Sequence, residues 1–373
     1  MINNKLVLVM AFLKRILALW LLLSPGILLA WDFQPARPGR PFSFPRDHGA
    51  HPEYKTEWWY FSGHLKGGRG ENFGYQLTFF RVGLRQVNSE ARSRWRANTV
   101  YFAHLALTDL TDRVFRFWEK AQRGALGLAG AATLNLKVWV DDWQAEAQGE
   151  EYYLRARSED LSLELTLTPL KPPVLHGEGG FSRKAALSQV ASHYYSITRL
   201  ATRGQILWRG RPLTVTGMSW FDREFSSSHL AQNQVGWDWF ALQLDDGFDL
   251  MLYLMRLKDG HLDPASAGTL VDPEGKPRAL NAGDFQISVT DTWKSPHSGA
   301  VYPAGWRLVL PKWGYDLKVT PALGDQELRT GGDRGITYWE GQVLVQGTRS
   351  GQKIEGKGYV ELTGYAGPLG GRF

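Results

Sequence analysis

Hydrophobic and polar residues alternate in two neighbouring runs, WDWFALQL at 237–244 and FDLMLYLMR at 248–256. Successive side chains of a β-strand point to opposite faces, so each run predicts a strand. The Asp-Asp-Gly sequence between them predicts a tight turn and therefore an antiparallel hairpin. Both faces of this hairpin carry large apolar side chains, which water does not favour on either side of a sheet. A closed barrel with an apolar interior removes one of these faces from water. The other face is then expected to pack against a second surface.

The same pattern occurs earlier in the chain. An aromatic run at 56–65 and an apolar run at 73–81, joined by a glycine-rich turn, predict a second hairpin. Each hairpin begins with tryptophans and ends near an arginine. The residues that we match are Arg81 with Arg256 and Trp59 with Trp239.

Other similar pieces follow the two hairpins in the same order. Residues 152–169 resemble residues 306–321, and residues 194–217 resemble residues 338–358. A fixed order of similar pieces indicates a duplicated architecture. We expect an N-terminal half at 50–228 and a C-terminal half at 232–367.

Short strands predominate in the remaining pattern, and no heptad or 3.6-residue period occurs. The 373 residues are 43% hydrophobic and 13% aromatic, with 41 glycines, which favours strands and tight turns over helices and allows real cores. We therefore predict an all-β fold of two tandem antiparallel barrels. Residues 220–240 form the joint, because the last strand of one barrel leads directly into the first strand of the other. The polar segment 226–235 is expected to be a surface connection.

The first thirty residues have the features of a secretory signal peptide. Three cations precede the apolar run Ile16 to Leu23, and a small residue, Ala30, ends the segment. Pro25-Gly26 interrupts the apolar run and leaves too few residues to span a bilayer. We predict that residues 1–30 are removed near Trp31 and that the mature chain is periplasmic or secreted.

Charge and cysteine content exclude several classes of function. Removing the three cations of residues 1–30 lowers the formal net charge from +6 to +3, spread evenly, which does not favour nucleic acid as a partner. The chain has no cysteine, so it can form neither disulfides nor a lipid-anchored N-terminal cysteine. The histidine spacings match no compact metal signature, and we predict neither a metal nor another cofactor.

Six motifs stand out along the chain: EWWYFSGHL at 57–65, WFDREF at 220–225, GWDWFALQLDDG at 236–247, DQEL at 325–328, YWEG at 338–341 and GYVELTGY at 358–365. In this order they resemble the AttH-like family, whose members include carotenoid 1,2-hydratase, also called hydroxyneurosporene synthase. The resemblance covers residues 50–367 and implies two tandem lipocalin-like (calycin) barrels, in agreement with the repeat. The resemblance does not select one function. The family contains a hydratase branch and many secreted members without an assigned activity, which are often labelled hydrolases.

Acids and indoles concentrate at the joint. Hydration of an isolated double bond needs an acid to protonate carbon, an apolar pocket and aromatic faces to stabilise the cation. The candidate acids are Asp222, Asp238 and Glu224, and the candidate ligand-binding residues are Trp59, Trp220, Trp237, Trp239, Tyr253 and His229. Alternatively, the tryptophans are core residues, and the acids pair with Arg223, Arg81 or Arg256. Glu327, Glu340 and Glu361 are expected to pair with arginines such as Arg329 or to complete hydrogen bonds at strand ends, without a catalytic role.

Two hypotheses about function follow. In the first, the chain is an exported lipocalin-like protein that holds an apolar lipid or isoprenoid-like ligand in a barrel or at the joint. In the second, it is a hydratase or isomerase that acts on such a ligand without a cofactor. A serine hydrolase is disfavoured because no G-x-S-x-G motif occurs. An adaptor for an envelope or membrane-associated partner is a third, weaker reading, and the sequence leaves the oligomeric state open.

Overall fold

The computed structural model describes residues 33–84, 98–228, 230–331, 335–367 and 369. The segment 1–30, for which we predict a signal peptide, lies outside them. The described chain is almost entirely β-structure, with two short 3-10 helices, η1 (Arg46–His48) and η2 (Pro311–Trp313). The predicted all-β fold is confirmed. In the described ranges, no helix has the length and apolarity that a bilayer crossing requires.

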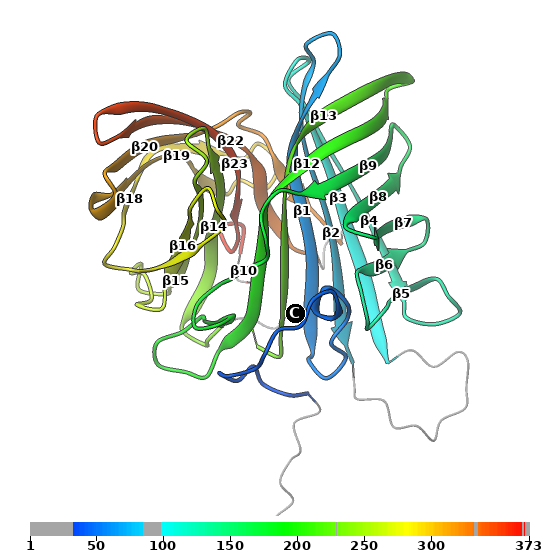
Figure 1. Ribbon diagram of the computed structural model, residues 1–373, viewed down its shortest axis with the longest axis horizontal. Coiled ribbons are helices and arrows are strands. Elements are labelled where there is room, and N and C mark those ends of the chain that lie inside the picture. Colours follow the sequence, from blue (N-terminus) through cyan, green and yellow to red (C-terminus); the bar gives the residue numbers. More distant parts are fainter. Residues whose placement is uncertain (1–32, 85–97, 229, 332–334, 368, 370–373) are drawn as a thin grey trace, which may run out of the picture. The chain divides into compact units, whose positions relative to one another are not determined.

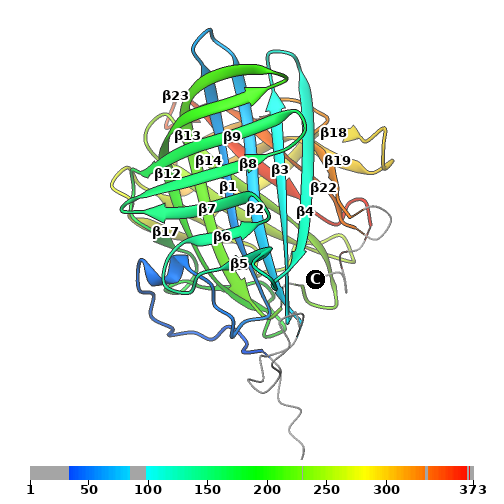
Figure 2. The same cartoon turned by 90° about the vertical axis from the view of Figure 1, so that its right-hand side faces the viewer.

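The first sheet is antiparallel throughout and contains the strands from Thr56 to Ser226 (Figure 1). In spatial order its strands are β4 (Val114–Arg123), β3 (Thr99–Asp109), β2 (Asn72–Gly83), β1 (Thr56–Gly67), β13 (Arg211–Ser226), β12 (Ala191–Trp208), β9 (Leu161–Pro169), β8 (Glu151–Arg157), β7 (Trp143–Gln148), β6 (Lys137–Val140) and β5 (Ala129–Ala131). Two short strands, β10 (Val174–Leu175) and β11 (Phe181–Arg183), also pair with β12. The sheet curls so that β6 packs against β2, β3 and β4, as Figure 2 shows from the side.

The second sheet is likewise antiparallel and contains the strands from Gln234 to Leu362. In spatial order its strands are β17 (Pro277–Asn281), β16 (Ala267–Val271), β15 (Asp249–Leu257), β14 (Gln234–Leu244), β23 (Gln352–Leu362), β22 (Thr337–Arg349), β20 (Tyr315–Pro321), β19 (Val301–Leu310) and β18 (Gln286–Lys294). The short strand β21 (Glu327–Arg329) also pairs with β22. The hairpin predicted at 237–256 is β14 and β15, and the hairpin predicted at 56–81 is β1 and β2.

Each sheet curls around its own apolar core as a lipocalin-like barrel, which confirms the predicted tandem architecture. The first core includes Phe61 and Leu77, and the second includes Phe240, Leu252 and Trp306, all almost fully buried. The duplication is visible in the strand order, because β2-β1-β13-β12-β9 in one sheet corresponds to β15-β14-β23-β22-β20 in the other. We refer to the two halves as barrel 1 and barrel 2.

The pairing register corrects one residue match within this duplication. Arg81 lies opposite Glu57, and Arg256 lies opposite Gly236, so the two arginines correspond as predicted. Counting from these pairs, Trp239 corresponds to Tyr60, and the match of Trp239 with Trp59 is wrong by one residue. A shift of one residue reverses the face of a strand. Trp59 therefore points into the core of barrel 1, whereas Trp239 points out of barrel 2.

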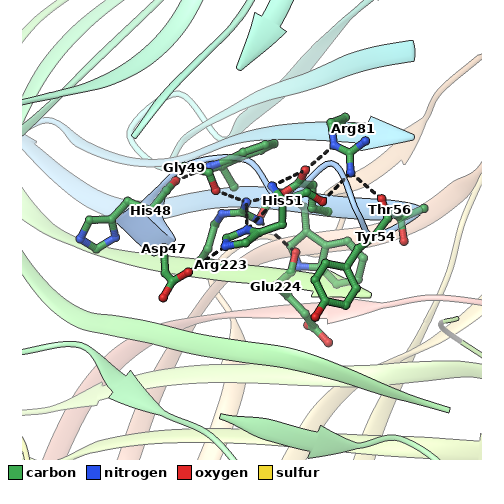
Figure 3. A network of polar contacts seen from close by, with 12 residues as sticks. Asp47, His48, Gly49, His51, Tyr54, Thr56, Arg81, Arg223 and Glu224 are labelled. Carbon is green, nitrogen blue, oxygen red and sulfur yellow. Dashed lines mark hydrogen bonds and ion pairs between the residues drawn. The ribbon is translucent and has the colours of Figure 1, made fainter. Parts of the chain in front are cut away.

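A buried ionic network fixes the entry segment of the chain against barrel 1 (Figure 3). Glu57 is fully buried and accepts hydrogen bonds from both Arg81 and Arg223. Arg81 also donates to the carbonyls of His51 and Tyr54, at 2.9 and 2.6 Å. Burial opposes ionisation of Glu57, but the charges of Arg223 and Arg81 outweigh it and hold its pKa well below the usual range. The network thus joins strands β1, β2 and β13 to the segment that precedes them.

Candidate functional site

The outer faces of the two barrels pack against each other. Strand β1 contacts β23, β12 contacts β14, and β2 contacts β22. The approach is close at Gly74 on β2, where a Cβ atom would lie 2.5 Å from both Gln342 Oε1 and Tyr359 Oη. A separate apolar cluster fills this contact, and its members come from both barrels. They are Tyr60, Tyr194, Trp220, Trp239, Ala241, Met251, Tyr253, Met255 and Tyr359. The second apolar face of the 237–256 hairpin is therefore covered by the other barrel.

A cavity with a volume of about 310 Å³ lies within this contact, and we call it the inter-barrel cavity. Its walls are mainly aromatic, and they include Trp58, Tyr60, Tyr194, Trp237, Trp239 and Tyr253. Five carboxyl groups share the same walls, from Glu119, Asp222, Glu224, Glu340 and Glu361. Aromatic faces with a few converging polar groups are typical of a ligand-binding site.

Asp222 enters the cavity from β13, where it lies between Tyr60 and Ser196 of the neighbouring strands. Its Oδ1 atom accepts hydrogen bonds from Trp220 Nε1 at 2.9 Å, from Tyr194 Oη at 3.1 Å, and from Ser196 Oγ. Its Oδ2 atom receives no hydrogen bond from any described residue. Burial raises the pKa of Asp222 to about 7, although the three hydrogen bonds to Oδ1 lower it. Asp222 is therefore a carboxyl group that can hold a proton near neutral pH.

Asp222 is one acidic centre of the cavity, and Glu340 and Glu361 form a second acidic centre. They lie directly opposite each other on β22 and β23, and Glu340 is buried whereas Glu361 is partly buried. The Trp237 indole donates to Glu361 Oε2 at 3.0 Å, but no described cation forms an ion pair with either glutamate. Burial raises the pKa of both groups, and the charge of Glu361 raises that of Glu340 further. When two neighbouring carboxyl groups have no cation beside them, the charge of one disfavours ionisation of the other. The pair therefore retains at least one proton more readily than an isolated carboxyl group does.

Two polar atoms near this second centre lack partners. Within the described part of the chain, Tyr60 Oη and Glu340 Oε1 are buried and make no hydrogen bond. Burial raises the pKa of the Tyr60 phenol, and the nearby Glu340 charge adds to the effect. Buried polar groups are normally satisfied, so such atoms in a cavity wall are available to a ligand or a water molecule.

Glu224, in contrast, has a cationic partner in the cavity wall. Lys184 Nζ lies 3.0 Å from Glu224 Oε1, 4.2 Å from the ring centre of Tyr253 and 4.8 Å from that of Tyr194. The ion pair and the two rings together hold the lysine in place. Glu224 therefore has a charge partner that Asp222 lacks.

The two acidic centres occupy corresponding places in the duplicated sheets. Asp222 lies opposite Tyr60 of β1, and Glu361 lies opposite Trp239 of β14. By the same register, Ser196 on β12 corresponds to Glu340 on β22. At this corresponding position each barrel thus contributes an acid beside one large aromatic ring, Asp222 beside Tyr60 and Glu361 beside Trp239.

The structure gathers five of the nine candidate site residues around this cavity. They are Asp222, Glu224, Trp237, Trp239 and Tyr253. Trp220 lies behind the wall, where its indole donates to Asp222. His229 lies outside the described residues.

Two other candidates face away from the cavity. Asp238 lies on the opposite side of β14 from Trp239, where its Oδ1 atom is 2.9 Å from Arg256 Nε and both oxygens contact Tyr365 Oη. The alternative reading, a carboxylate paired with an arginine, therefore describes Asp238. Trp59 is fully buried in barrel 1, donates to the His48 carbonyl and stacks under the Arg223 guanidinium. The alternation of side chains along a strand places both residues on the wrong face for the cavity.

The expectation that Glu340 and Glu361 pair with arginines is wrong. Both lie in the cavity wall, and no described arginine reaches them. The duplication contained a signal for this, because aligning GYVELTGY with SWFDREF by strand register places Glu361 at the position of Asp222. When each motif is considered alone, nothing in it indicates that Glu361 belongs with Asp222.

A serine, a histidine and an aspartate lie in contact near the cavity, but not in the order of a hydrolase. His176 Nε2 lies 2.6 Å from Ser196 Oγ, and Ser196 in turn donates to Asp222. In a catalytic triad the histidine stands between the serine and the acid. Here the serine stands between the other two residues and is itself fully buried, which does not provide a nucleophile.

Comparison with known proteins places this arrangement in a family. The model of the AttH-like family matches residues 35–365. The chain belongs to the AttH-like family. A crystal structure of an AttH-like protein from Nitrosomonas europaea is 37% identical, with a TM-score of 0.80, covering 89% of this chain and all of that one. No curated protein matches the chain by sequence.

More distant solved structures share the fold of this AttH-like chain. Kievitone hydratase from Nectria haematococca is 15% identical with a TM-score of 0.67, and the match covers 90% of this chain and 99% of that one. CghA is 12% identical with a TM-score of 0.55, and the match covers 91% and 96% of the two chains. At these identities the likeness concerns the fold alone. Among the described residues, no three histidine, aspartate or glutamate side chains gather as a metal site.

Proposed function

We propose that this AttH-like protein binds an apolar, unsaturated ligand in the inter-barrel cavity and acts on it as a cofactor-independent hydratase or isomerase. One observation carries the proposal. Asp222 is a buried carboxyl group in an aromatic cavity, with a pKa near 7, and among the described residues it has no cationic partner and no hydrogen bond to its Oδ2 atom. A carboxyl group in this state can donate a proton at neutral pH.

The cavity supplies the other requirements of such a reaction. Proton transfer from Asp222 to one carbon of a double bond uses the π electrons to form the C–H bond and leaves a cation on the other carbon. The faces of Trp239 and Tyr60 stabilise this cation without reacting with it. Attack by water followed by loss of its proton gives an alcohol, whereas loss of a proton from a neighbouring carbon moves the double bond. Glu361, whose pKa is raised to about 7, is partly ionised at neutral pH and can accept the released proton.

The fold shared with kievitone hydratase supports this proposal, because that protein is a hydratase with the same tandem barrels. The AttH-like family also contains members whose ligand is not established, so the fold does not name the ligand. The runner-up is a carrier that binds the same class of ligand without changing it. The aromatic lining is compatible with either function, whereas the two acidic centres favour the enzyme.

Binding is tested with farnesol, an isoprenoid alcohol, and with any ligand recovered by organic extraction of the purified protein. Trp239→Ala is expected to weaken binding by at least tenfold, because it removes a ring from the cavity wall. Trp139→Ala is the control, because Trp139 is on β6 and does not line the cavity. Calorimetric titration checks both variants. Equal affinities in Trp239→Ala and the native chain would place the ligand elsewhere.

Chemistry is tested by incubating the same ligand with the native protein in heavy water. A hydratase or isomerase adds a proton from solvent to carbon, so mass spectrometry is expected to find carbon-bound deuterium in the ligand. A carrier releases the ligand unlabelled. Bound ligand without deuterium would therefore favour the carrier.

We also propose that the protein is exported, on the basis of the signal-like sequence at 1–30. Expression of the whole gene product is expected to give a mature chain that begins near Trp31 outside the cytoplasm. N-terminal sequencing of the exported fraction checks this expectation. A product that retains Met1 in the membrane fraction would contradict it.

A further inference from the structure

His176 connects the two barrels to the buried side of Asp222. It follows β10, its side chain is fully buried, and it does not line the inter-barrel cavity. Its Nδ1 atom lies 2.9 Å from Thr269 Oγ1 on β16 of barrel 2. Its Nε2 atom lies 2.6 Å from Ser196 Oγ on β12 of barrel 1. Ser196 Oγ then contacts Asp222 Oδ1. Four side chains thus form one continuous chain of three hydrogen bonds.

The direction of this chain follows from the donors at Oδ1. An indole N–H can only donate, so the Trp220 contact makes Oδ1 an acceptor. An oxygen that already accepts from Trp220 and Tyr194 is the unprotonated oxygen of the carboxyl group, so Ser196 donates its only proton to it. Ser196 Oγ must then accept from His176, which requires a proton on Nε2. Nδ1 is therefore bare and accepts from the Thr269 hydroxyl.

The charge state of His176 fits this direction. Burial lowers the pKa of His176 to about 3, and the Lys184 charge lowers it further, so the ring is neutral at working pH. A neutral ring has one donor and one acceptor nitrogen, and the chain uses each of them once. The Glu224 charge raises the pKa of Asp222 further, and Tyr194 is a neutral donor to it.

We infer that Thr269 and His176 are positioning residues for Asp222, which direct the Ser196 hydroxyl onto Oδ1 and so leave the acid's proton on Oδ2, the oxygen to which no described residue donates. The inference deepens the proposed function and rests on it for its catalytic meaning. Its structural content does not depend on any ligand. Barrel 2 orients the acid of barrel 1, so the two barrels form one site.

Nuclear magnetic resonance of the whole protein, with nitrogen-labelled histidine and carbon-labelled aspartate, tests this inference without substrate. Comparison with His176→Asn assigns the His176 signals. In the native chain His176 is expected to be neutral with its proton on Nε2. Ser196→Ala removes one donor from the Asp222 carboxylate and is expected to raise the aspartate pKa by about one unit. A native ring with the proton on Nδ1, or a cationic ring, overturns the inference.

Thr269→Val tests the Thr269 end of the hydrogen-bond chain. Thr269→Ser is its matched control because it keeps the hydroxyl group. In Thr269→Val the ring loses the donor to Nδ1, so we expect its signals to shift toward the second tautomer and the Asp222 pKa to rise in the same direction as in Ser196→Ala. Thr269→Ser is expected to retain both native values. A merely structural role of Thr269 would leave both readouts unchanged in Thr269→Val, which contradicts the inference. A protein with the predicted tautomer but no deuterium transfer to ligand would overturn the proposed function alone.

Discussion

Asp222→Asn is expected to stabilise the fold above pH 7 and to abolish carbon deuteration of the ligand. The folded-state pKa of Asp222 is raised from 3.8 to about 7 by burial, so the folded protein holds a proton that the unfolded chain releases at lower pH. Stability from this group is complete below pH 4 and is lost as the pH rises toward 7. A shift of this size corresponds to roughly 2–4 kcal/mol, which the neutral Asn side chain does not lose. Loss of the proton donor should lower the rate by about 100-fold or more.

Thermal denaturation at pH 5 and pH 8, with the heavy-water assay, checks this prediction. The native chain is expected to lose more stability between the two pH values than Asp222→Asn does, while ligand binding changes little. Asp238→Asn is the matched control, because Asp238 is buried nearby but paired with Arg256. Burial also raises the pKa of Asp238, to about 6, but its replacement leaves the Arg256 guanidinium without its partner, so Asp238→Asn should destabilise the protein. An Asp222→Asn protein that unfolds as readily as Asp238→Asn would show that Asp222 has a structural role instead.

Glu57→Gln is expected to be the most destabilising single change in barrel 1. Glu57 is fully buried between Arg81 and Arg223, so its loss leaves two buried guanidinium groups without this counter-charge. Breaking a buried pair in this way costs about 3–5 kcal/mol. The depressed pKa of Glu57 means that its contribution is present above its ordinary pKa of 4.5 and is lost as the pH falls.

Urea denaturation at pH 7 measures this loss. Lys353→Met is the control, because it removes an ion pair with Glu355 that is exposed to solvent and should change stability little. The entry segment should also become more sensitive to protease in Glu57→Gln, because Arg81 and Arg223 bind its carbonyls. Equal denaturation midpoints for the two variants would contradict the role assigned to the network.

The site itself was only partly predictable. Aromatic and acidic residues near 220–240 indicated a site at the joint, and Asp222, Trp237 and Trp239 do line the cavity. Asp238 was grouped with them because it is adjacent in sequence, but adjacent residues on a strand face opposite sides. His176 was not singled out, because nothing in its local sequence indicates that it contacts Ser196 and Thr269.

The sequence by itself determined the strands, the hairpins and the duplication, because these depend on the two-residue period of side chains and on turn residues close in the chain. It also indicated that both faces of the 237–256 hairpin are covered. Only the tertiary structure decided which acids meet. Asp222 on β13 and Glu361 on β23 come together because two barrels pack by their outer faces, and this packing joins residues more than a hundred positions apart. The pKa of each acid then depends on burial and on the cations within reach, which local sequence does not specify.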